Sequence, residues 1–366
     1  MKNIDTMKNI IFRITPPNPP NDGILFADLQ KSDRSGHMGH ALVEYAPGEI
    51  LAFYPNCSSE DPRWNGHSGY GWMEYKRSID GGETWSEPMV EPNSKALFDK
   101  GIGRSFMCEK AIKTDSGRII FFYLNCDMIT NGHIWEPYFE PYYAFSEDNG
   151  NSFSEAKQLF DQRGRVYDAI YHEGTIYVLF NADPELPGKA HNGDYDLLLY
   201  TSSDNGESFE LRSKIGFTST KHCFYGTMVF TPEHDLLVYT YDDQDEHNLK
   251  YIISKDRGFT WQNNRRAYFE KKLRNPQIIY YGNRYFIHGR GGHPKEFYGA
   301  LVLYSSTDGI NWDEGVYLRH KTASAGAYSN NLVVHCSDGR ERLMIQSSHA
   351  YEACKTNVIM FFVDMA

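Results

Sequence analysis

Histidine, arginine and tyrosine recur in this sequence near the start of successive β-rich runs. Arginine binds carboxylates through paired, charge-assisted hydrogen bonds, while histidine and tyrosine can donate or accept protons. A set of such residues converging on one point would form a polar pocket suited to an anionic sugar. The residues at these positions are His37, His40, Arg104, Arg165, Tyr167, Asp168, His222, Tyr225, Arg274, Asn275 and Tyr328, and nearby loops add His67, Tyr70, Arg290 and His293.

The stretches that must position these residues share one layout: a β-rich run, a turn, a second run, a longer loop and a third run. In the first stretch the runs are 40–45, 50–54 and 71–76, with Ala46, Pro47 and Gly48 in the turn. Four more stretches repeat the layout up to residue 304, and a sixth comprises 332–336, 342–346 and 358–363. Helical periodicity is absent, so the pattern indicates an all-β fold.

A turn motif of the form Ser-x-Asp-x-Gly-x-Ser/Thr-Trp/Phe follows the third run. Its Ser and Asp can bond backbone amides, and its Gly can adopt a positive φ. The starts lie 68, 56, 52 and 51 residues apart, which is the mark of a repeat array. The copies are Ser78–Trp85, Ser146–Phe153, Ser202–Phe209 and Ser254–Trp261, and a fifth, Ser305–Trp312, has its Asp one place later.

Short strands at this spacing predict a six-bladed β-propeller whose blades are four-stranded antiparallel sheets, with residues 1–366 as a single domain. A β-sandwich or a β-helix is the rival interpretation. The last stretch lacks a clear fourth strand. We expect residues 1–30 to supply it, through 10–14 or 24–27, because closure of the ring hides exposed strand edges.

Composition narrows the possible partners. The net charge of −11 argues against a nucleic acid or an anionic membrane as partner, and leaves an oligosaccharide or glycoconjugate as the expected one. The six cysteines form no C-x-x-C pair and are expected to be buried thiols. No cofactor is expected, and no metal, since no two histidines stand at a convincing ligand spacing. The absence of a long apolar run favours a cytoplasmic protein.

The repeated turn is similar to the Asp-box, or BNR repeat, of the sialidase-like superfamily, and the resemblance covers nearly everything from His40 onward. In that superfamily the boxes lie away from the active site. The segment Ala327–Leu332 resembles the one that carries the nucleophilic tyrosine of sialidases, which implies this role for Tyr328. The loop Ser58–Tyr70 corresponds to the region of the acid/base aspartate, which implies Asp61, or Glu60 beside it.

The sequence also departs from the sialidase pattern. His37–Leu42 stands where the first arginine of the carboxylate-binding triad is expected, and the triad arginine before the fourth box is missing from Tyr241–Glu246. His222–Tyr225 replaces the glutamate that supports the tyrosine.

Three interpretations of the function follow from this pattern. The first is a glycosidase with Tyr328 as nucleophile, Asp61 as acid/base, and His222 or Tyr225 tuning the tyrosine. The second is a polysaccharide lyase in which His40 or His222 is the base and a tyrosine the acid. The third is a propeller that binds glycans without cleaving them.

Overall fold

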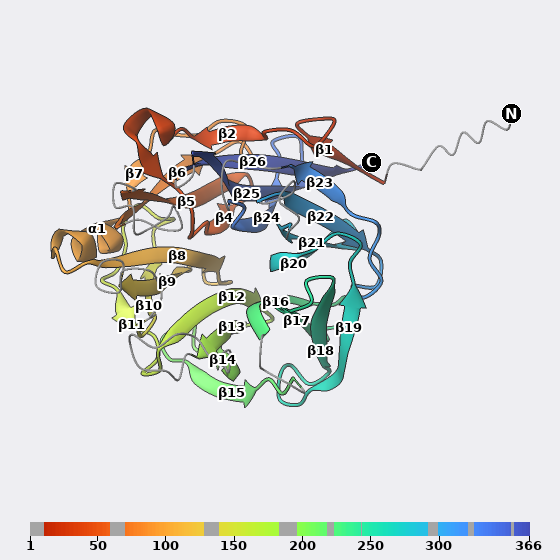
Figure 1. The fold of residues 1–366 in the computed structure, drawn as a ribbon. Helices are drawn as coiled ribbons and strands as arrows, with labels where there is room; N and C mark the ends of the chain where they lie inside the picture. Colours follow the sequence, from red (N-terminus) through yellow and green to blue (C-terminus); the bar gives the residue numbers. More distant parts are fainter. Residues whose placement is uncertain are drawn as a thin grey trace, which may run out of the picture.

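Six antiparallel sheets surround a common axis in the computed structural model (Figure 1). The model describes residues 11–58, 70–127, 139–182, 196–217, 223–242, 244–291, 299–320, 326–352 and 355–366. The predicted six-bladed β-propeller is therefore confirmed. No helix in these residues has the length and apolar character needed to cross a membrane.

Each blade is a meander in which successive strands pair, with the first strand nearest the axis. The first three blades consist of the following strands: β3 (Arg34–Ser35), β4 (Leu42–Ala46), β5 (Glu49–Ser58), β6 (Gly71–Ser78) and β7 (Met89–Val90); β8 (Arg104–Lys113), β9 (Ile119–Asp127), β10 (Tyr142–Ser146) and β11 (Lys157–Gln158); β12 (Gly164–His172), β13 (Thr175–Ala182), β14 (Asp196–Ser202) and β15 (Glu210–Lys214). In blade 1, β3 and β4 both pair with β5.

Blades 4 to 6 continue the meander to the C-terminus. They consist of β16 (Cys223–Phe230), β17 (Leu236–Asp242), β18 (Asn248–Ser254) and β19 (Gln262–Tyr268); β20 (Arg274–Tyr281), β21 (Arg284–Arg290), β22 (Leu301–Ser306) and β23 (Val316–Arg319); β24 (Ser329–His335), β25 (Glu341–Glu352) and β26 (Lys355–Met365), which pairs with β1 (Phe12–Thr15) and β2 (Ile24–Ala27).

Two short helical segments interrupt the all-β pattern within the described residues. A 3-10 turn, η1, spans Gln30–Ser32, and one α-helix, α1, spans Pro92–Asp99 between β7 and β8. The Glu91 side chain caps α1 by accepting hydrogen bonds from the backbone amides of Asn93 and Ser94. At eight residues the helix is too short to show a helical period in the sequence.

The repeated turns form one hydrogen-bond pattern. In the first box, the Ser78 hydroxyl donates to Asp80 Oδ1 at 2.7 Å, and the Gly82 amide donates to Ser78 Oγ at 2.9 Å. Asp80 Oδ1 also accepts from the Thr84 amide at 2.9 Å. The fifth turn begins one residue later than the sequence motif predicted. Ser306 takes the place expected for Ser305, so the fifth turn is one residue shorter.

Each box glycine packs on the preceding blade. A Cβ added to Gly150 would lie 2.4 Å from Leu51, and one added to Gly206 would lie 2.5 Å from Ile120. Both glycines have a positive φ, 74° and 82°, which L residues adopt at a cost. The boxes therefore fasten neighbouring blades together at one end of the propeller.

The ring closes in blade 6, where the first and last strands of the chain lie side by side (Figure 1). Phe12 of β1 faces Met365 of β26, and Leu25 of β2 faces Ile359 of the same strand. The structure thus uses both of the N-terminal segments that the sequence offered as alternatives. They pair with successive halves of β26.

Candidate functional site

The axial end opposite the boxes is built from irregular backbone. Four innermost strands have a register shift at the same level, between Cys108 and Lys110 in β8, Val166 and Asp168 in β12, Phe224 and Thr227 in β16, and Arg274 and Gln277 in β20. A bulge breaks the alternation of side chains and re-aims the inserted residue. The inserted residues Glu109, Tyr167, Tyr225 and Asn275 all line one cavity on the axis.

Blades 1 and 6 complete this cavity, and each has a positive-φ residue just before its innermost strand. Gly39 has φ 79° and Ala327 has φ 76°. A Cβ on Gly39 would lie 3.2 Å from the Cys108 carbonyl oxygen, so only glycine fits this close approach without displacement. Every blade contributes to the cavity, whose described lining is Gly39, His40, Glu109, Arg165, Tyr167, Tyr225, Asn275, Gln277, Tyr328, Ser329 and Asn330.

A chain of hydrogen bonds crosses the cavity from blade 2 to blade 6. Glu109 Oε2 accepts from Arg165 Nη2 at 2.7 Å, and Arg165 Nη1 donates to the Tyr225 hydroxyl at 3.4 Å. The hydroxyls of Tyr225 and Tyr328 lie 3.1 Å apart. Burial raises the pKa of Tyr225 well above its ordinary value, and neighbouring Tyr328 adds to this. Tyr225 is therefore protonated at neutral pH and able to donate to the Tyr328 oxygen.

Two further arginines flank this chain. The guanidinium carbon of Arg290 lies 5.8 Å from the centre of the Tyr328 ring, and the guanidinium carbon of Arg165 lies 5.9 Å from the same ring centre. Arg274 Nη2 donates to the Tyr241 hydroxyl at 3.2 Å and Arg274 Nε lies 3.0 Å from a Glu246 oxygen.

Arg290 differs from the other two in its partners. Its residue is 7% exposed, and its buried Nη1 has no hydrogen-bond partner among the described residues. No described carboxylate forms an ion pair with it, whereas Arg165 and Arg274 each have one. Arg290 is also the last residue of β21, not a loop residue as the sequence suggested. It is the guanidinium best placed to receive an anionic group.

The two histidines of blade 1 have different surroundings. The His37 ring packs edge-on against Tyr328, with ring centres 4.8 Å apart. His40 is buried, with Nε2 3.0 Å from the His37 carbonyl oxygen and Nδ1 3.3 Å from the Gln346 amide nitrogen. Burial lowers the pKa of His40 to about 4. His40 is thus a neutral side chain with both ring nitrogens engaged inside the protein.

A buried polar network closes the axis beneath the cavity. Lys110 Nζ lies 3.1 Å from Asp168 Oδ1 and donates to the side-chain oxygens of Gln277 at 2.6 Å and Asn330 at 2.7 Å. Asp168 Oδ2 accepts from the Thr227 hydroxyl at 2.8 Å. The network joins blades 2 to 6 and separates the cavity from a funnel of about 430 Å³ at the box end, which Lys110 and Asp168 also line.

Two predicted site residues lie away from the cavity. Arg104 begins β8 as expected, but its guanidinium lies 3.8 Å from the centre of the Phe139 ring. Tyr70 donates to the Phe98 carbonyl oxygen at 2.7 Å and packs beside α1. The predicted Asp61, Glu60, His67, His222 and His293 lie outside the described residues.

Sequence reasoning missed some residues of this region, of which Glu109, Lys110 and Tyr241 are the most prominent. Glu109 and Lys110 are adjacent in one strand, and strict alternation would send their side chains to opposite faces. The bulge at Glu109 lets both reach the axis. A local sequence signal for it is absent, because the bulge is defined only by pairing with β9.

Comparisons with known proteins were made for both sequence and structure. A family model described as the glycosyl hydrolases family 32 N-terminal domain matches residues 207–338, about a third of the chain. A search of curated proteins found no significant match. The fold is a sialidase-like six-bladed propeller, and it is shared with glycoside hydrolases.

Solved structures cover almost the whole chain. A protein of unknown function from Dyadobacter fermentans superposes with a TM-score of 0.70 at 13% identity, covering 96% of this chain and 99% of its own. The Hadza microbial sialidase Hz136 gives 0.67 at 13% identity, with coverage of 94% and 68%. The intramolecular trans-sialidase from Ruminococcus gnavus, in complex with oseltamivir carboxylate, gives 0.62 at 11% identity, with coverage of 93% and 97%.

Proposed function

We propose that this protein is a glycosidase that removes an acidic sugar, with Tyr328 as the nucleophile. The observation that carries the proposal is the position of the Tyr328 phenol, which lies in a cavity lined by all six blades and bonds to Tyr225. The guanidinium carbons of Arg165 and Arg290 lie 5.9 Å and 5.8 Å from the centre of its ring.

The charge of the cavity favours an anionic substrate. The chain as a whole carries a net charge of −11, yet two buried arginines lie near the Tyr328 ring: the guanidinium carbon of Arg290 is 5.8 Å and that of Arg165 is 5.9 Å from the ring centre. Arg290 has no described acidic partner, and an arginine fork binds a carboxylate through two parallel hydrogen bonds. A phenol also approaches an anomeric carbon beside a carboxylate with less repulsion than a carboxylate nucleophile would meet.

The proposed reaction has two steps. The Tyr328 oxygen attacks the anomeric carbon while the glycosidic C–O bond breaks, and an acid protonates the departing oxygen. Asp61 stays the predicted acid. Glu109 is our candidate to take the phenol proton, because it lines the same cavity and its buried Oε1 has no hydrogen-bond partner among the described residues. Water then attacks the sugar carbon and gives a proton to the Asp61 carboxylate, the bond between the sugar and Tyr328 breaks, and Glu109 returns its proton to the phenolate oxygen.

The lyase interpretation draws less support. It needs a histidine base, for which the sequence offered His40 or His222. His40 has both ring nitrogens engaged and a pKa lowered by burial to about 4. A base with so low a pKa removes a carbon-bound proton weakly. His222 lies outside the described residues.

The test is a panel of sialosides, uronate oligosaccharides and neutral glycosides, with products identified by mass. Hydrolysis adds one water to the products, elimination leaves an unsaturated uronate, and a binding protein gives no product. We expect Tyr328→Phe to lower kcat by about 1,000-fold or more, because it removes the nucleophilic oxygen.

Tyr171→Phe, at the box end of β12, is the matched control and should leave kcat unchanged. A fluorinated substrate analogue that slows the second step should label the peptide containing Tyr328. Full turnover by the Tyr328→Phe variant, or hydrolysis of neutral glycosides alone, would refute the proposal.

A further inference from the structure

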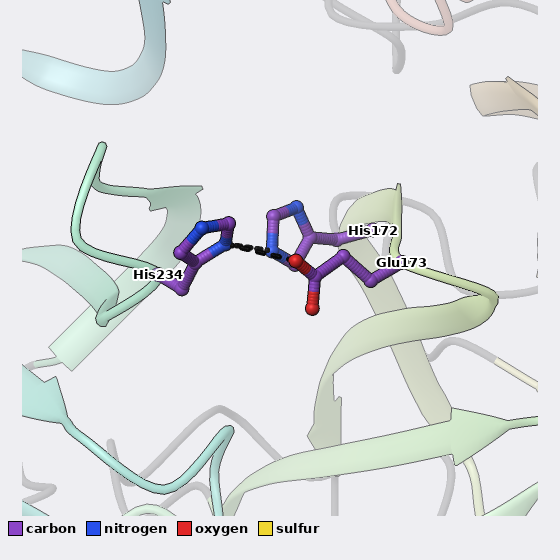
Figure 2. A group of neighbouring side chains, drawn as sticks. All are labelled: His172, Glu173 and His234. Carbon is purple, nitrogen blue, oxygen red and sulfur yellow. Dashed lines mark hydrogen bonds and ion pairs between the residues drawn. The ribbon is translucent and has the colours of Figure 1, made fainter.

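Three potential metal ligands meet at the box end, far from the candidate site. His172 is the last residue of β12, Glu173 follows it, and His234 lies in the turn between β16 and β17 of the next blade. Figure 2 shows the two imidazole rings facing each other with the Glu173 carboxylate beside them. Arg165 stands seven residues earlier on β12, so the two sites are about 20 Å apart along the strand.

The backbone holds these residues in place. His172 pairs with Thr175, which leaves a two-residue hairpin loop of Glu173 and Gly174. Both have positive φ, 44° and 77°, the conformation of the tight turn that matches strand twist. His234 also has a positive φ, 64°, and its amide donates to the Thr231 carbonyl oxygen at 2.9 Å.

The distances fit a tetrahedral ion. His172 Nε2 lies 3.1 Å from His234 Nδ1, and His234 Nδ1 lies 3.2 Å from Glu173 Oε1. The three ligand atoms all lie within 4.8 Å of one another. Zinc bonds of about 2.0–2.1 Å to nitrogen and oxygen place neighbouring tetrahedral ligands about 3.3 Å apart, so two of the three edges already have nearly the required length.

We propose that His172, Glu173 and His234 form a binding site for a divalent transition metal ion, with zinc as the expected occupant. Two imidazole nitrogens and one carboxylate oxygen suit zinc and its neighbours in the first transition series, and suit calcium or magnesium poorly. Three protein ligands leave the fourth position to water or to a group of a bound molecule. His172 also lines the axial funnel at this end, so that open position adjoins a cavity of about 430 Å³.

Neighbouring side chains orient the ligands as an outer shell would. The His172 ring stacks on Phe230, with ring centres 3.8 Å apart and planes 14° apart. Arg257 forms an ion pair with Glu173 Oε2, which leaves Oε1 directed at His234. Such outer contacts fix ligand geometry in metal sites.

A metal ion would also satisfy the three ligand atoms of the cluster better than hydrogen bonds among them would. His234 Nδ1 is within hydrogen-bond distance of both His172 Nε2 and Glu173 Oε1, yet it carries at most one proton. A metal ion would accept a lone pair from all three atoms together. Because the ligands come from blades 3 and 4, the bound ion would also link those two hairpins.

The test is a zinc titration of the full chain after treatment with a chelator, followed by calorimetry. We expect wild-type protein to bind one more zinc ion per chain than His172→Ala/His234→Ala. Glu173→Gln should weaken this site about tenfold or more. His335→Ala is the matched control, because His335 is a half-exposed histidine at the same end that contacts Glu44 and Glu341, and it should bind zinc as the wild type does.

The thermal midpoint supplies a second readout. Saturating zinc should raise the midpoint of wild type and of His335→Ala by about 3 °C, and should leave the double variant unchanged. Equal stoichiometry and affinity in the wild type and the double variant would overturn the proposal. So would an undiminished affinity in Glu173→Gln, which tests the site even where the double variant folds poorly.

Discussion

The two ends of this propeller differ in how similar the blades are to one another. At the box end, each of five blades repeats one serine–aspartate–glycine turn with nearly the same hydrogen bonds. At the cavity end no such repeat is seen, and the blades contribute unlike sets of residues, including Glu109, Arg165, Tyr225 and Tyr328.

The difference separates structural from chemical demands on the same fold. Every blade must pack on its neighbour in a similar way, so the same turn is repeated. Recognising an asymmetric molecule on the axis needs a different side chain from each direction. Bulges in four innermost strands supply that freedom without changing the sheets outside them.

A fall in pH should give the largest difference between the two ends, because buried histidines lose their contribution to stability at a higher pH than the box aspartates do. Burial lowers the pKa of His40 to about 4 and that of His288 to about 3, so both are neutral in the fold and take up protons on unfolding below about pH 6.5. Stability from this source is full above pH 6.5 and falls as the pH decreases, by about 1.4 kcal/mol per pH unit for each histidine.

The box carboxylates titrate in a lower range. Hydrogen bonds led by those from Ser152 and Thr260 lower the pKa values of Asp148 and Asp256 to about 2, so their contribution is lost only as the pH falls below about 4. Urea unfolding at pH 7, 6 and 5 tests the separation. His288→Gln should reduce the slope, and a free energy of unfolding that stays constant between pH 7 and 5 would contradict it.

Removing one arginine from each end should then affect different properties. Arg290→Met should lower kcat/KM for the substrate found by the panel about 10- to 100-fold, because it removes charge-assisted hydrogen bonds to the anionic group. Arg118→Met, at the box end, removes an arginine that contacts Glu147 and Glu207 and should cost about 1 kcal/mol of stability. Steady-state kinetics and denaturation measure both variants. A loss of activity in Arg118→Met would contradict the conclusion that the box end contributes to stability and not to activity.

A glycine substitution at the box end tests how much the packing of a box on the preceding blade stabilises the fold. Gly206→Ala should lower the free energy of unfolding by about 2 kcal/mol, from its positive φ and the 2.5 Å approach to Ile120. Gly117→Ala has a similar φ of 90° but no atom within 4 Å, so about 1 kcal/mol is expected. Chemical denaturation distinguishes them, and equal losses would show that packing on the preceding blade contributes nothing.

The sequence predicted the fold well because the boxes are local. Serine, aspartate and glycine define the turn within eight residues, and their spacing along the chain marks five blades. The sixth blade was predicted from the same order of strand-forming runs, without a box.

The site was predicted less completely because it depends on distant pairing. Arg104 stands where the pattern placed it, yet its side chain turns to Phe139, while the neighbouring Glu109 reaches the axis through a bulge. His172 and His234 lie 62 residues apart and meet only because their blades are adjacent. No spacing rule for metal ligands within a single segment would pair them.

The closure of blade 6 determines the order in which the molecule can be completed. β1 is synthesised long before its partner β26, and Phe12 meets Met365 only after the five blades between them have been synthesised. Contacts this distant in sequence are slow to form. Until then the nascent chain carries an open sheet edge at each end of an unfinished ring, and β26 must be synthesised before either edge is protected.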